Sequence, residues 1–244
     1  MYETIVVIPT FISHPLRYRL FDQLWHDQGV GKVLVVDNGN SFGVPDKKQR
    51  TWSKIQVLRP GVNLNWLRAC NYGAKEALRT GMPYVTFLND DVSLSRNYFL
   101  ELIEAFRANE NVGLLTSLYN EKFCLPAYCD KSVHGWRPQA VEREIAYTDG
   151  TIMFMPRETL TDVGLLDETF ADPGWGADSD YGYRVRQEGK RVLVTHRAML
   201  WHKGGVTGDH VYGGREQRIS RGCRQMSDDL ERKYGTEWRR LLEL

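Results

Sequence analysis

Three polar residues, Asn89, Asp90 and Asp91, follow directly after the apolar run "YVTFL" (84–88). The run is rich in β-branched and aromatic residues, so we expect a buried strand that delivers two adjacent carboxylates to its end. Neighbouring carboxylates repel each other and lose solvation free energy when they are partly buried, so a cation or several hydroxyl groups commonly satisfy them. A solvated turn, in which one of the acids caps the next helix, is the alternative. The stretch 86–94 by itself leaves both interpretations open.

Asp37 and His202 also stand where strands are expected to end. Asp37 closes "VLVVD", and His202 leads from "AMLWH" into a Gly-rich segment. In a parallel α/β sheet, ligands bind beyond the carboxyl ends of the strands, so acids at two such ends suggest one shared polar cleft. A lone histidine is more often only a polar residue at a strand end. Across a cleft from an acidic pair, however, it is a candidate metal ligand.

Asp178 lies in "GWGADSDYGYR" (174–184), where small residues lead into an expected helix. The residue could simply cap that helix, because a carboxylate is favoured at a helix N-terminus. A carboxylate in a Gly-flanked, aromatic-lined entry also has what a general base needs, namely a fixed position, access for substrate and partial desolvation that raises its basicity. Arg184 lies one helical turn after Asp180 and is expected to pair with it.

The elements that must position these residues follow a βαβ rhythm. Leu16, Leu20 and Leu24 recur at helical spacing between the strand-like runs 4–9 and 32–37. This alternation predicts an α/β fold with a mostly parallel sheet covered by helices. Further strands are expected at 54–59, 84–89, 112–119, 150–156 and 191–202, and further helices at 65–79, 96–108, 157–164 and 178–189.

Two regions depart from this rhythm. Residues 120–147 are predicted to be an inserted loop or irregular hairpin. The Gly-rich stretch 202–214 is predicted to be a mobile loop, and 216–244 a polar terminal helix. That helix would dock through a stripe formed by Leu230, Tyr234, Trp238 and Leu241.

The composition is that of an ordinary globular chain. Its 244 residues are 42% hydrophobic, which is enough for one sizeable core. The 32 basic and 31 acidic residues are interspersed and give a formal net charge of +1, so there is no global electrostatic case for binding nucleic acid or an anionic membrane. No segment approaches the roughly 18 apolar residues of a membrane span, and the first residues lack the basic start of a signal peptide. We therefore expect a cytoplasmic protein without an integral membrane segment.

The cysteines do not predict a disulfide scaffold. Cys124 and Cys129 in "CLPAYC", with His134 following, could in principle bind zinc. Their spacing is loose and no convincing fourth ligand accompanies them, so loop thiols are the favoured interpretation.

Five ordered motifs resemble those of the inverting, nucleotide-sugar-dependent glycosyltransferases of family 2, which have the GT-A fold. They are "VVIPTF" with "VVDNGN", then "NLNWLRACNYG", "FLNDD", "GTIMFMPRETLTDVGLLDETF", and "GADSDYGYRVRQEGKRVLVTHRAMLWHKGG". The resemblance covers about residues 4–205, and its specificity lies in the order and spacing of the motifs rather than in any one of them. It implies a Rossmann-like GT-A domain over residues 1–205. Residues 206–244 would then be a Gly-rich loop and a C-terminal helical extension packed on the same domain.

The resemblance also implies roles for individual residues. Thr10 and Asp37 would hold the nucleotide base, and an acid such as Asp37 suits the imide N–H of a pyrimidine, so a UDP- or dTDP-sugar is the expected donor. Asp90 would contact the ribose. Asp91 and His202 would bind a divalent cation, Mn²⁺ or Mg²⁺, of which Mn²⁺ tolerates an imidazole better. Further nucleotide-sugar contacts are implied at the motif positions Pro9, Asn63, Arg68 and Asn71, where Arg68 could either touch phosphate or brace the acids.

Asp178 would be the catalytic base that deprotonates the acceptor hydroxyl as it attacks the anomeric carbon with inversion. Three residues depart from the family pattern. Asn65 replaces a glycine, Asn89 replaces the first acid of the D-x-D motif, and Ala177 replaces a glutamate before the base. The last two keep open an inactive nucleotide-sugar-binding protein. A nucleotidyltransferase is less favoured, because "PTFISHPLRYR" has no glycine after the first strand to hold a triphosphate.

The motifs do not identify the acceptor, which could be a glycan, a lipid-linked sugar, a protein side chain or a modified base. The segment 120–147 is expected to influence that choice. Its aromatic residues Phe123, Tyr128 and Trp136 could stack on sugar rings, although packing within a small insertion is equally compatible with the sequence.

Overall fold

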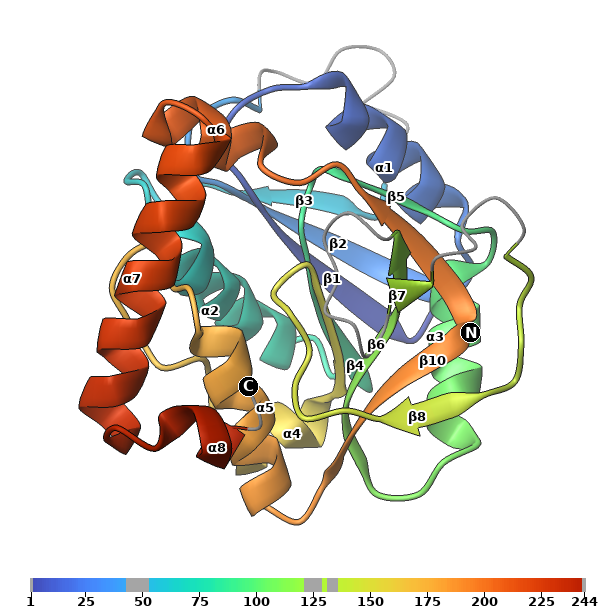
Figure 1. The fold of residues 1–244 in the computed structure, drawn as a ribbon. Coiled ribbons are helices and arrows are strands. Elements are labelled where there is room, and N and C mark those ends of the chain that lie inside the picture. Colours follow the sequence, from blue (N-terminus) through green and yellow to red (C-terminus); the bar gives the residue numbers. More distant parts are fainter. Residues whose placement is uncertain (1, 43–52, 121–128, 131–135, 243–244) are drawn as a thin grey trace.

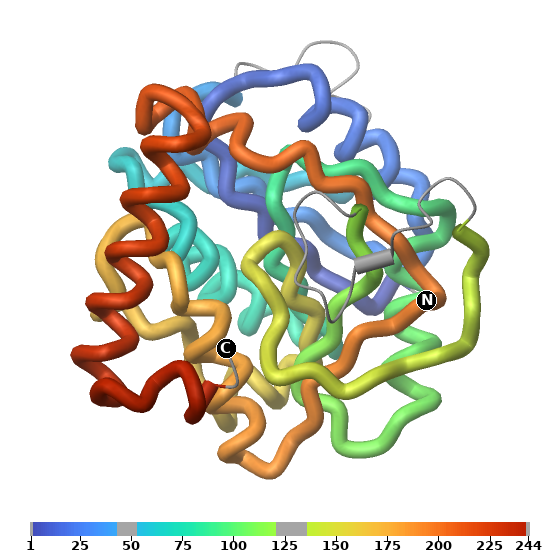
Figure 2. The backbone as a smooth tube through the Cα atoms, in the orientation of Figure 1, coloured from blue at the N-terminus to red at the C-terminus, as the bar shows by residue number. Residues whose placement is uncertain are grey.

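The computed structural model describes residues 2–42, 53–120, 129–130 and 136–242. The strands are β1 (Thr4–Thr10), β2 (Val30–Asp37), β3 (Ile55–Leu58), β4 (Tyr84–Leu88), β5 (Val92–Leu94), β6 (Val112–Asn120), β7 (Cys129–Asp130), β8 (Glu142–Glu144), β9 (Ile152–Pro156) and β10 (Arg191–His202). The helices are α1 (Pro15–His26), α2 (Asn65–Leu78), α3 (Tyr98–Arg107), α4 (Arg157–Asp162), α5 (Ala177–Gln187), α6 (Val206–Tyr212), α7 (Arg215–Tyr234) and α8 (Trp238–Leu242). Figure 1 shows the sheet between two groups of helices, and Figure 2 traces the same path of the chain. The predicted α/β class is confirmed.

The strands follow the order β3-β2-β1-β4-β9-β6-β10-β5 in one sheet. Strands β3, β2, β1 and β4 are parallel, whereas β9 is antiparallel to both β4 and β6. In the parallel register Thr10 lies beside Asp37. The polar residues that follow these strands therefore reach one edge of the sheet, which is where an α/β sheet binds its ligands.

Strand β10 joins two distant parts of the chain. It pairs with the parallel strand β6, and its last three residues also pair antiparallel with β5. In that short ladder His202 lies opposite Val92, and the amide of Lys203 donates to the carbonyl of Asp91 at 3.0 Å. The end of β10 is thereby placed beside the acidic residues that follow β4.

The side chains of β1 enter two hydrophobic layers on opposite faces of the sheet. Val6 and Ile8 pack with residues of α1 and α3, whereas Ile5 and Val7 pack with residues of α2 and α5. All four side chains are fully buried. Helices on both faces explain why "TIVVIP" is a continuous apolar run rather than an alternating one.

The prediction of a loop over residues 202–214 is wrong in its central part. Helix α6 occupies Val206–Tyr212, and Gly205 and Gly213 bound it in the left-handed backbone region. Glycines at both ends can therefore start and stop a short helix as well as form a loop.

The predicted terminal helix is divided at Gly235, which follows the last residue of α7. Leu230 and Trp238 are buried with the layer that contains α2 and α5, as predicted. Leu241 is 40% exposed and Leu242 is 1% exposed, so the prediction that Leu241 docks is wrong. The break changes the rotational position of α8 and turns Leu242 inward instead. Within the described part of the chain, no helix combines the length and the apolar character needed to cross a bilayer.

The predicted insertion at 120–147 is described in part. Trp136 is partly buried and packs against the hydrophobic layer of α1 and α3, which favours the packing interpretation for this residue. Phe123, Cys124, Tyr128 and His134, as well as the side chain of Cys129, lie outside the described residues.

A buried ionic network attaches α7 to α5. The carboxylate of Asp180 is fully buried and accepts hydrogen bonds from Arg184 Nε at 2.9 Å and from the Tyr234 hydroxyl at 2.6 Å. Lys233 Nζ lies 2.5 Å from the same carboxylate. The predicted pairing of Arg184 with Asp180 is confirmed, and a fully paired, inaccessible Asp180 is unsuited to act as a catalytic base.

Asp180→Ala should lower the free energy of unfolding by up to about 3 to 5 kcal/mol, because it removes the fully buried carboxylate that pairs with the partly exposed cations Arg184 and Lys233. Chemical denaturation followed by circular dichroism measures this change. Glu237→Ala is the matched control, since Glu237 forms only an exposed pair with Arg240 and should change stability by less than about 1 kcal/mol. A loss below about 1 kcal/mol for Asp180→Ala would show that the network does not hold α7 in place.

Candidate active site

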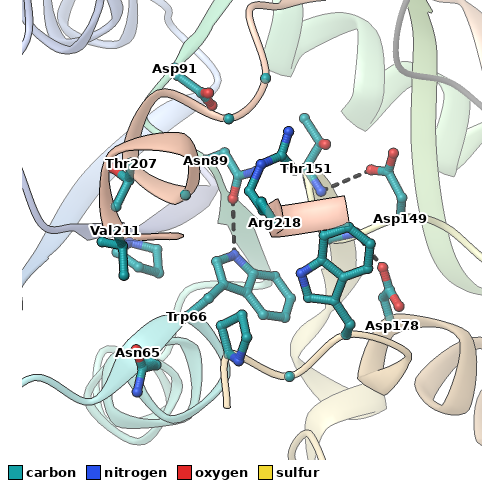
Figure 3. Close-up of a pocket in the computed structure, with 18 of the residues that line it drawn as sticks. Asn65, Trp66, Asn89, Asp91, Asp149, Thr151, Asp178, Thr207, Val211 and Arg218 are labelled. Carbon is teal, nitrogen blue, oxygen red and sulfur yellow. Dashed lines mark hydrogen bonds between the residues drawn. The ribbon is translucent and has the colours of Figure 1, made fainter. Parts of the chain in front are cut away.

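A pocket of about 770 Å³ opens where β1 and β4 end, between this edge of the sheet and the helices α5 to α8. Figure 3 shows Asp91, Asp149, Asp178 and Arg218 around it. The sequence-predicted site residues that line it are Pro9, Thr10, Asn63, Asp90, Asp91, Asp178 and His202. Carboxylates from three separate segments of the chain therefore share one cavity.

Asp91 and His202 form a close pair in this pocket. His202 Nε2 lies 3.1 Å from Asp91 Oδ1, and His202 Nδ1 lies 3.2 Å from the Thr151 hydroxyl. Burial opposes ionisation of Asp91, but the hydrogen bond and charge of His202 outweigh it and lower the pKa of the Asp91 carboxyl. Burial likewise opposes protonation of His202, yet the contact with Asp91 raises the pKa of the imidazole. The contact therefore favours the ionised form of Asp91 and the protonated form of His202.

The geometry of this pair fits a divalent cation. Metal–ligand distances of about 2.0 to 2.2 Å place neighbouring ligands of an octahedral ion about 3 Å apart, which is close to the 3.1 Å between the two ring and carboxylate atoms. No group of three or more His, Cys, Asp or Glu side chains that could hold a metal occurs within the described residues. A cation held by Asp91 and His202 would therefore need oxygen ligands from a bound substrate and from water, as Mg²⁺ and Mn²⁺ sites on phosphates do.

Asp90 turns away from this pair toward His14. Asp90 Oδ2 lies 3.3 Å from His14 Nε2, while His14 Nδ1 accepts the amide of Arg17 at the start of α1. Neither Asp90 Oδ2 nor His14 Nε2 has a well-directed hydrogen bond, and the buried hydroxyl of Thr10 has none within the described part of the chain. Burial raises the pKa of the Asp90 carboxyl. Buried polar atoms without partners at the ends of β1 and β4 are what a ligand with hydroxyl or amide groups would satisfy.

His14 was missed from the sequence. Its position immediately before Pro15, at the start of a helix that follows a strand, marks it as an N-terminal residue of α1. Nothing local in the sequence indicates that its second ring nitrogen faces Asp90, since that contact depends on how β1 and β4 pair.

Asp178 lies in the first turn of α5 but does not cap it. The cap position is Gly176, in the left-handed region with φ 89°. Asp178 Oδ2 accepts the amide of Gly150 at 2.8 Å, and Oδ1 accepts the amide of Ser179 at 2.9 Å. The side chain remains partly exposed to the pocket. Burial, followed by the nearby charge of Asp149, raises the pKa of Asp178 to about 6.

A carboxyl with a pKa near 6 is ionised at neutral pH and is a stronger base than an ordinary aspartate. Asp149, its neighbour in the pocket, accepts hydrogen bonds from the Tyr119 hydroxyl at 2.9 Å and from the amide of Thr151 at 2.8 Å. Both of these bonds end on Oδ1 of Asp149. Burial raises the pKa of Asp149 as well, so two neighbouring carboxylates in this pocket have raised basicity, and Asp178 is the one at the position where the sequence predicts the base.

Three residues predicted to bind the nucleotide sugar do not line the pocket. The Asn71 side chain is bonded on both sides, donating to the carbonyl of Leu166 at 2.8 Å and accepting its amide at 3.0 Å. Arg68 forms an ion pair with Asp172 instead. These positions correct the expected ligand contacts of Asn71 and Arg68, because their polar groups already stabilise the segment that leads to α5.

Asp37 is the third of these residues. Its carboxylate accepts the amide of Ser41 at 2.9 Å and the amide of Phe42 at 3.1 Å, and Asp37 is only 1% exposed. The acid therefore shapes the turn after β2. A direct contact between Asp37 and a nucleotide base would require the segment 41–42 to move.

Trp66 and Arg218 line the pocket without having been predicted. Trp66 Nε1 donates to Asn89 Oδ1 at 2.9 Å, as Figure 3 shows, so the asparagine at the D-x-D position orients a tryptophan rather than a cation. Arg218 Nε donates to Asp209 Oδ1 at 2.6 Å, and its side chain is 16% exposed. The two terminal nitrogens of Arg218 have no hydrogen-bond partner within the described residues.

Arg218 reaches the pocket across a glycine. A Cβ atom on Gly208 would lie 2.3 Å from Arg218 Cδ, so a side chain at position 208 would displace the arginine. The positive charge of Arg218 also acts on His202, where it opposes protonation. A guanidinium with free donors beside the Asp91–His202 pair is suited to bind phosphate oxygens. No sequence signal identified this residue, because it lies beyond the motifs.

Comparisons with known proteins agree with this geometry. The family model described as "Glycosyl transferase family 2" matches residues 5–162, and no curated protein matches the sequence. Among solved structures, GalNAc-T7 with UDP, GalNAc and Mn²⁺ has a TM-score of 0.63 at 13% identity, covering 97% of this chain and 50% of its own. The mannosyltransferase PcManGT from Pyrobaculum calidifontis, in complex with GDP-Man and Mn²⁺, has a TM-score of 0.62 at 16% identity, covering 94% and 64% respectively. The chain thus spans about half to two thirds of these two proteins, which are GT-A glycosyltransferases and share its fold.

Proposed function

Because the chain belongs to glycosyl transferase family 2, we propose that it transfers a sugar from a nucleotide-diphosphate sugar to an acceptor hydroxyl with inversion, assisted by a divalent cation. One observation carries this proposal. A single pocket contains both the Asp91–His202 pair and the accessible carboxylate of Asp178, whose pKa is raised to about 6. The first group suits the departing diphosphate and the second suits the attacking hydroxyl.

The diphosphate side of the reaction uses Asp91, His202 and Arg218. The first two residues would hold Mn²⁺ or Mg²⁺, and the neighbours that contain Mn²⁺ support this choice of metal. When bound, the cation neutralises the charge that develops on the leaving diphosphate. The free terminal nitrogens of Arg218 would donate to the same phosphate oxygens and so hold the leaving group in place.

The nucleoside side uses the ends of β1 and β4. Thr10 and Asp90 offer buried oxygens that lack good hydrogen bonds. These oxygens would form hydrogen bonds with the ribose and the base. His14 would hold the Asp90 side chain in position. Pro9 and Asn63 line the same part of the pocket. We propose UDP or dTDP as the nucleotide. Asp37 would support the base indirectly, through the turn at Ser41 that it stabilises.

Asp178 would take the proton of the acceptor hydroxyl. The acceptor oxygen then forms a bond to the anomeric carbon while the bond from that carbon to the diphosphate oxygen breaks. One carboxylate is enough for this displacement, because the departing diphosphate needs no proton donor of the kind that glycoside hydrolases use. The raised pKa of Asp178 supports this role, since its basicity is matched to neutral pH.

A thermal-shift panel of UDP, dTDP, GDP and CDP tests the proposed donor. We expect UDP or dTDP to give the largest stabilisation, about 2.7 kcal/mol at a hundred times its Kd, and only with Mn²⁺ present. A larger response to GDP would contradict the pyrimidine assignment. An equal response without Mn²⁺ would contradict the cation.

Turnover separates the proposed activity from the alternatives. Incubation with Mn²⁺ and a UDP-sugar should release UDP slowly, because water can replace the acceptor in a glycosyltransferase. Release of pyrophosphate from a nucleoside triphosphate and a sugar phosphate would instead indicate a nucleotidyltransferase. Binding of UDP without any turnover would favour the inactive binding protein.

A further inference from the structure

Trp175 presents an unused hydrogen-bond donor and a large apolar ring to the pocket. It lies three residues before Asp178, lines the pocket and is partly exposed. Its indole N–H has no hydrogen-bond partner within the described part of the chain. Trp66 differs, because its N–H is already bonded to Asn89. Trp238 also lines the pocket, but it is only 2% exposed. Trp175 is therefore the more accessible indole with an N–H donor that can still bind a ligand.

Helix α7 supports one face of the Trp175 ring. A Cβ atom on Gly222 would lie 2.3 Å from Trp175 Cδ2, 2.4 Å from Cε2 and 2.5 Å from Cε3. Cδ2 is a ring-fusion atom bonded to three other ring atoms, so a neighbour can approach it this closely only from above or below the ring plane. Gly222 must therefore pack flat on one face, which leaves the opposite face and the ring edge for the pocket.

Any side chain at position 222 would displace the indole. The nearest atoms are not the end of a flexible chain but the rigid centre of a ring. Turning the ring within its own plane would not relieve this contact, so the whole side chain would have to move toward the pocket. The orientation of Trp175 thus depends on a glycine of α7, a helix that lies outside the segment 5–162 matched by the family model.

We propose that the free face of Trp175 is the platform on which the acceptor binds, and that the acceptor unit is a pyranose ring. This inference rests on the proposed transfer to a hydroxyl at Asp178. A pyranose has C–H groups on one face and hydroxyls around its rim, so it matches an apolar indole face with an N–H donor at the ring edge. Three residues span at most about 11 Å between Cα atoms, so one sugar unit can touch both Trp175 and Asp178.

Other acceptor chemistries use this arrangement less completely. An aliphatic chain would cover the indole face but leave the N–H donor of Trp175 and the Asp178 carboxylate without partners. A flat nucleobase would stack on the indole equally well. The experiment below tests whether the protein binds a nucleobase more strongly than a sugar. The C-terminal helices would accordingly contribute to acceptor choice through the contact between Gly222 and Trp175.

Saturation-transfer NMR with methyl β-D-glucopyranoside and methyl β-D-galactopyranoside tests this proposal, with deoxycytidine as the nucleobase probe. UDP is present throughout with Mg²⁺, because Mg²⁺ is diamagnetic and does not broaden the ligand signals. We expect at least one glycoside to bind, with the strongest saturation on the protons of one ring face. Trp175→Ala should abolish that signal. Gly222→Ala should weaken glycoside binding by at least about tenfold, the effect of losing one aromatic contact.

Cys223→Ala is the matched control, because Cys223 is the exposed neighbour of Gly222 on α7 and should leave glycoside binding unchanged. Circular dichroism checks that each variant is folded, and Trp175→Phe provides a milder change if Gly222→Ala is unstable. Stabilisation by UDP with Mn²⁺ should persist in every variant.

The possible results separate the platform from the transferase itself. Glycoside binding that survives Trp175→Ala, stronger binding of deoxycytidine, or no glycoside binding to the UDP-bound protein would overturn the platform while leaving the proposed function intact. Failure of the unmodified protein to respond to any nucleotide would instead count against the proposed function.

Discussion

Asp178→Asn should lower the rate of sugar transfer by about 10²- to 10⁴-fold while leaving donor affinity unchanged. The substitution keeps the shape of the side chain but removes its ability to accept a proton, and general-base catalysis contributes a factor of this size. Donor binding should persist because the Asp91–His202 pair and Arg218 belong to other segments of the pocket. The measurement is turnover with a UDP-sugar beside UDP affinity for the same variant.

The pH profile gives an independent test of the same residue. A general base must be ionised, so kcat/KM of the unmodified protein should rise about tenfold per pH unit below the pKa of Asp178, which is about 6, and level off above it. In Asp178→Asn, kcat/KM should no longer rise with pH in this range. Asp228→Asn, an exposed acid of α7, should keep both the rate and the profile.

Stability adds a second readout for Asp178. Because the folded-state pKa is raised from 3.8 to about 6, the folded state binds more protons than the unfolded state between these values. Stability from this group is therefore present below about pH 4 and is lost as the pH rises to about 6. Asp178→Asn should be at least as stable as the unmodified protein above pH 6. Near-normal turnover in this variant would exclude Asp178 as the base and direct attention to Asp149.

Asp91→Ala should weaken the binding of Mn²⁺ and of the donor together. The loss should be at least roughly 10- to 100-fold, because removing even a residue that only hydrogen-bonds to a metal ligand reduces metal affinity by this factor. Asp91 and His202 are the side chains that would hold the cation, and the donor would supply further ligands to it, so either affinity depends on the other. His202→Ala should have the same effect. Calorimetric titration of Mn²⁺ in the presence and absence of UDP measures both affinities.

The double variant Asp91→Ala/His202→Ala identifies a shared site. If both residues hold one cation, removing the second should add little to the loss from the first, because neighbouring residues that act as a unit are not additive. Metal affinity should also rise with pH. The imidazole must lose its proton to bind a cation, and the pKa of His202 is raised above its ordinary value of 6.5.

Asp228→Ala controls for the general loss of one carboxylate. Additive losses in the double variant, or donor affinity that is unchanged in both single variants, would show that Asp91 and His202 form only an ion pair. Chelation of divalent cations should reduce the stabilisation by UDP in the unmodified protein and have no further effect on Asp91→Ala.

The sequence by itself determined those features of this protein that depend on residues close to one another along the chain. The apolar runs and their spacing predicted strands and helices in the correct order, since secondary structure follows a local period of two or 3.6 residues. The acids after strands followed from the same pattern, because parallel strands end at one edge of the sheet. Asp178 was identified as a residue near a helix start, although only the structure distinguished its bonds to Gly150 and Ser179 from a cap.

Tertiary structure alone decided which polar residues remain free to bind a ligand. Asn71 and Asp37 occur at motif positions, but their side chains hydrogen-bond to segments of the protein itself. Conversely, His14 and Arg218 belong to no local motif. His14 contacts Asp90, and Arg218 lines the pocket, only because elements distant in sequence pack together. Asp91 and His202, 111 residues apart, meet because the end of β10 pairs with β5. A residue's type states which bonds it can form, whereas the register and packing of distant elements determine whether another part of the chain has already taken them.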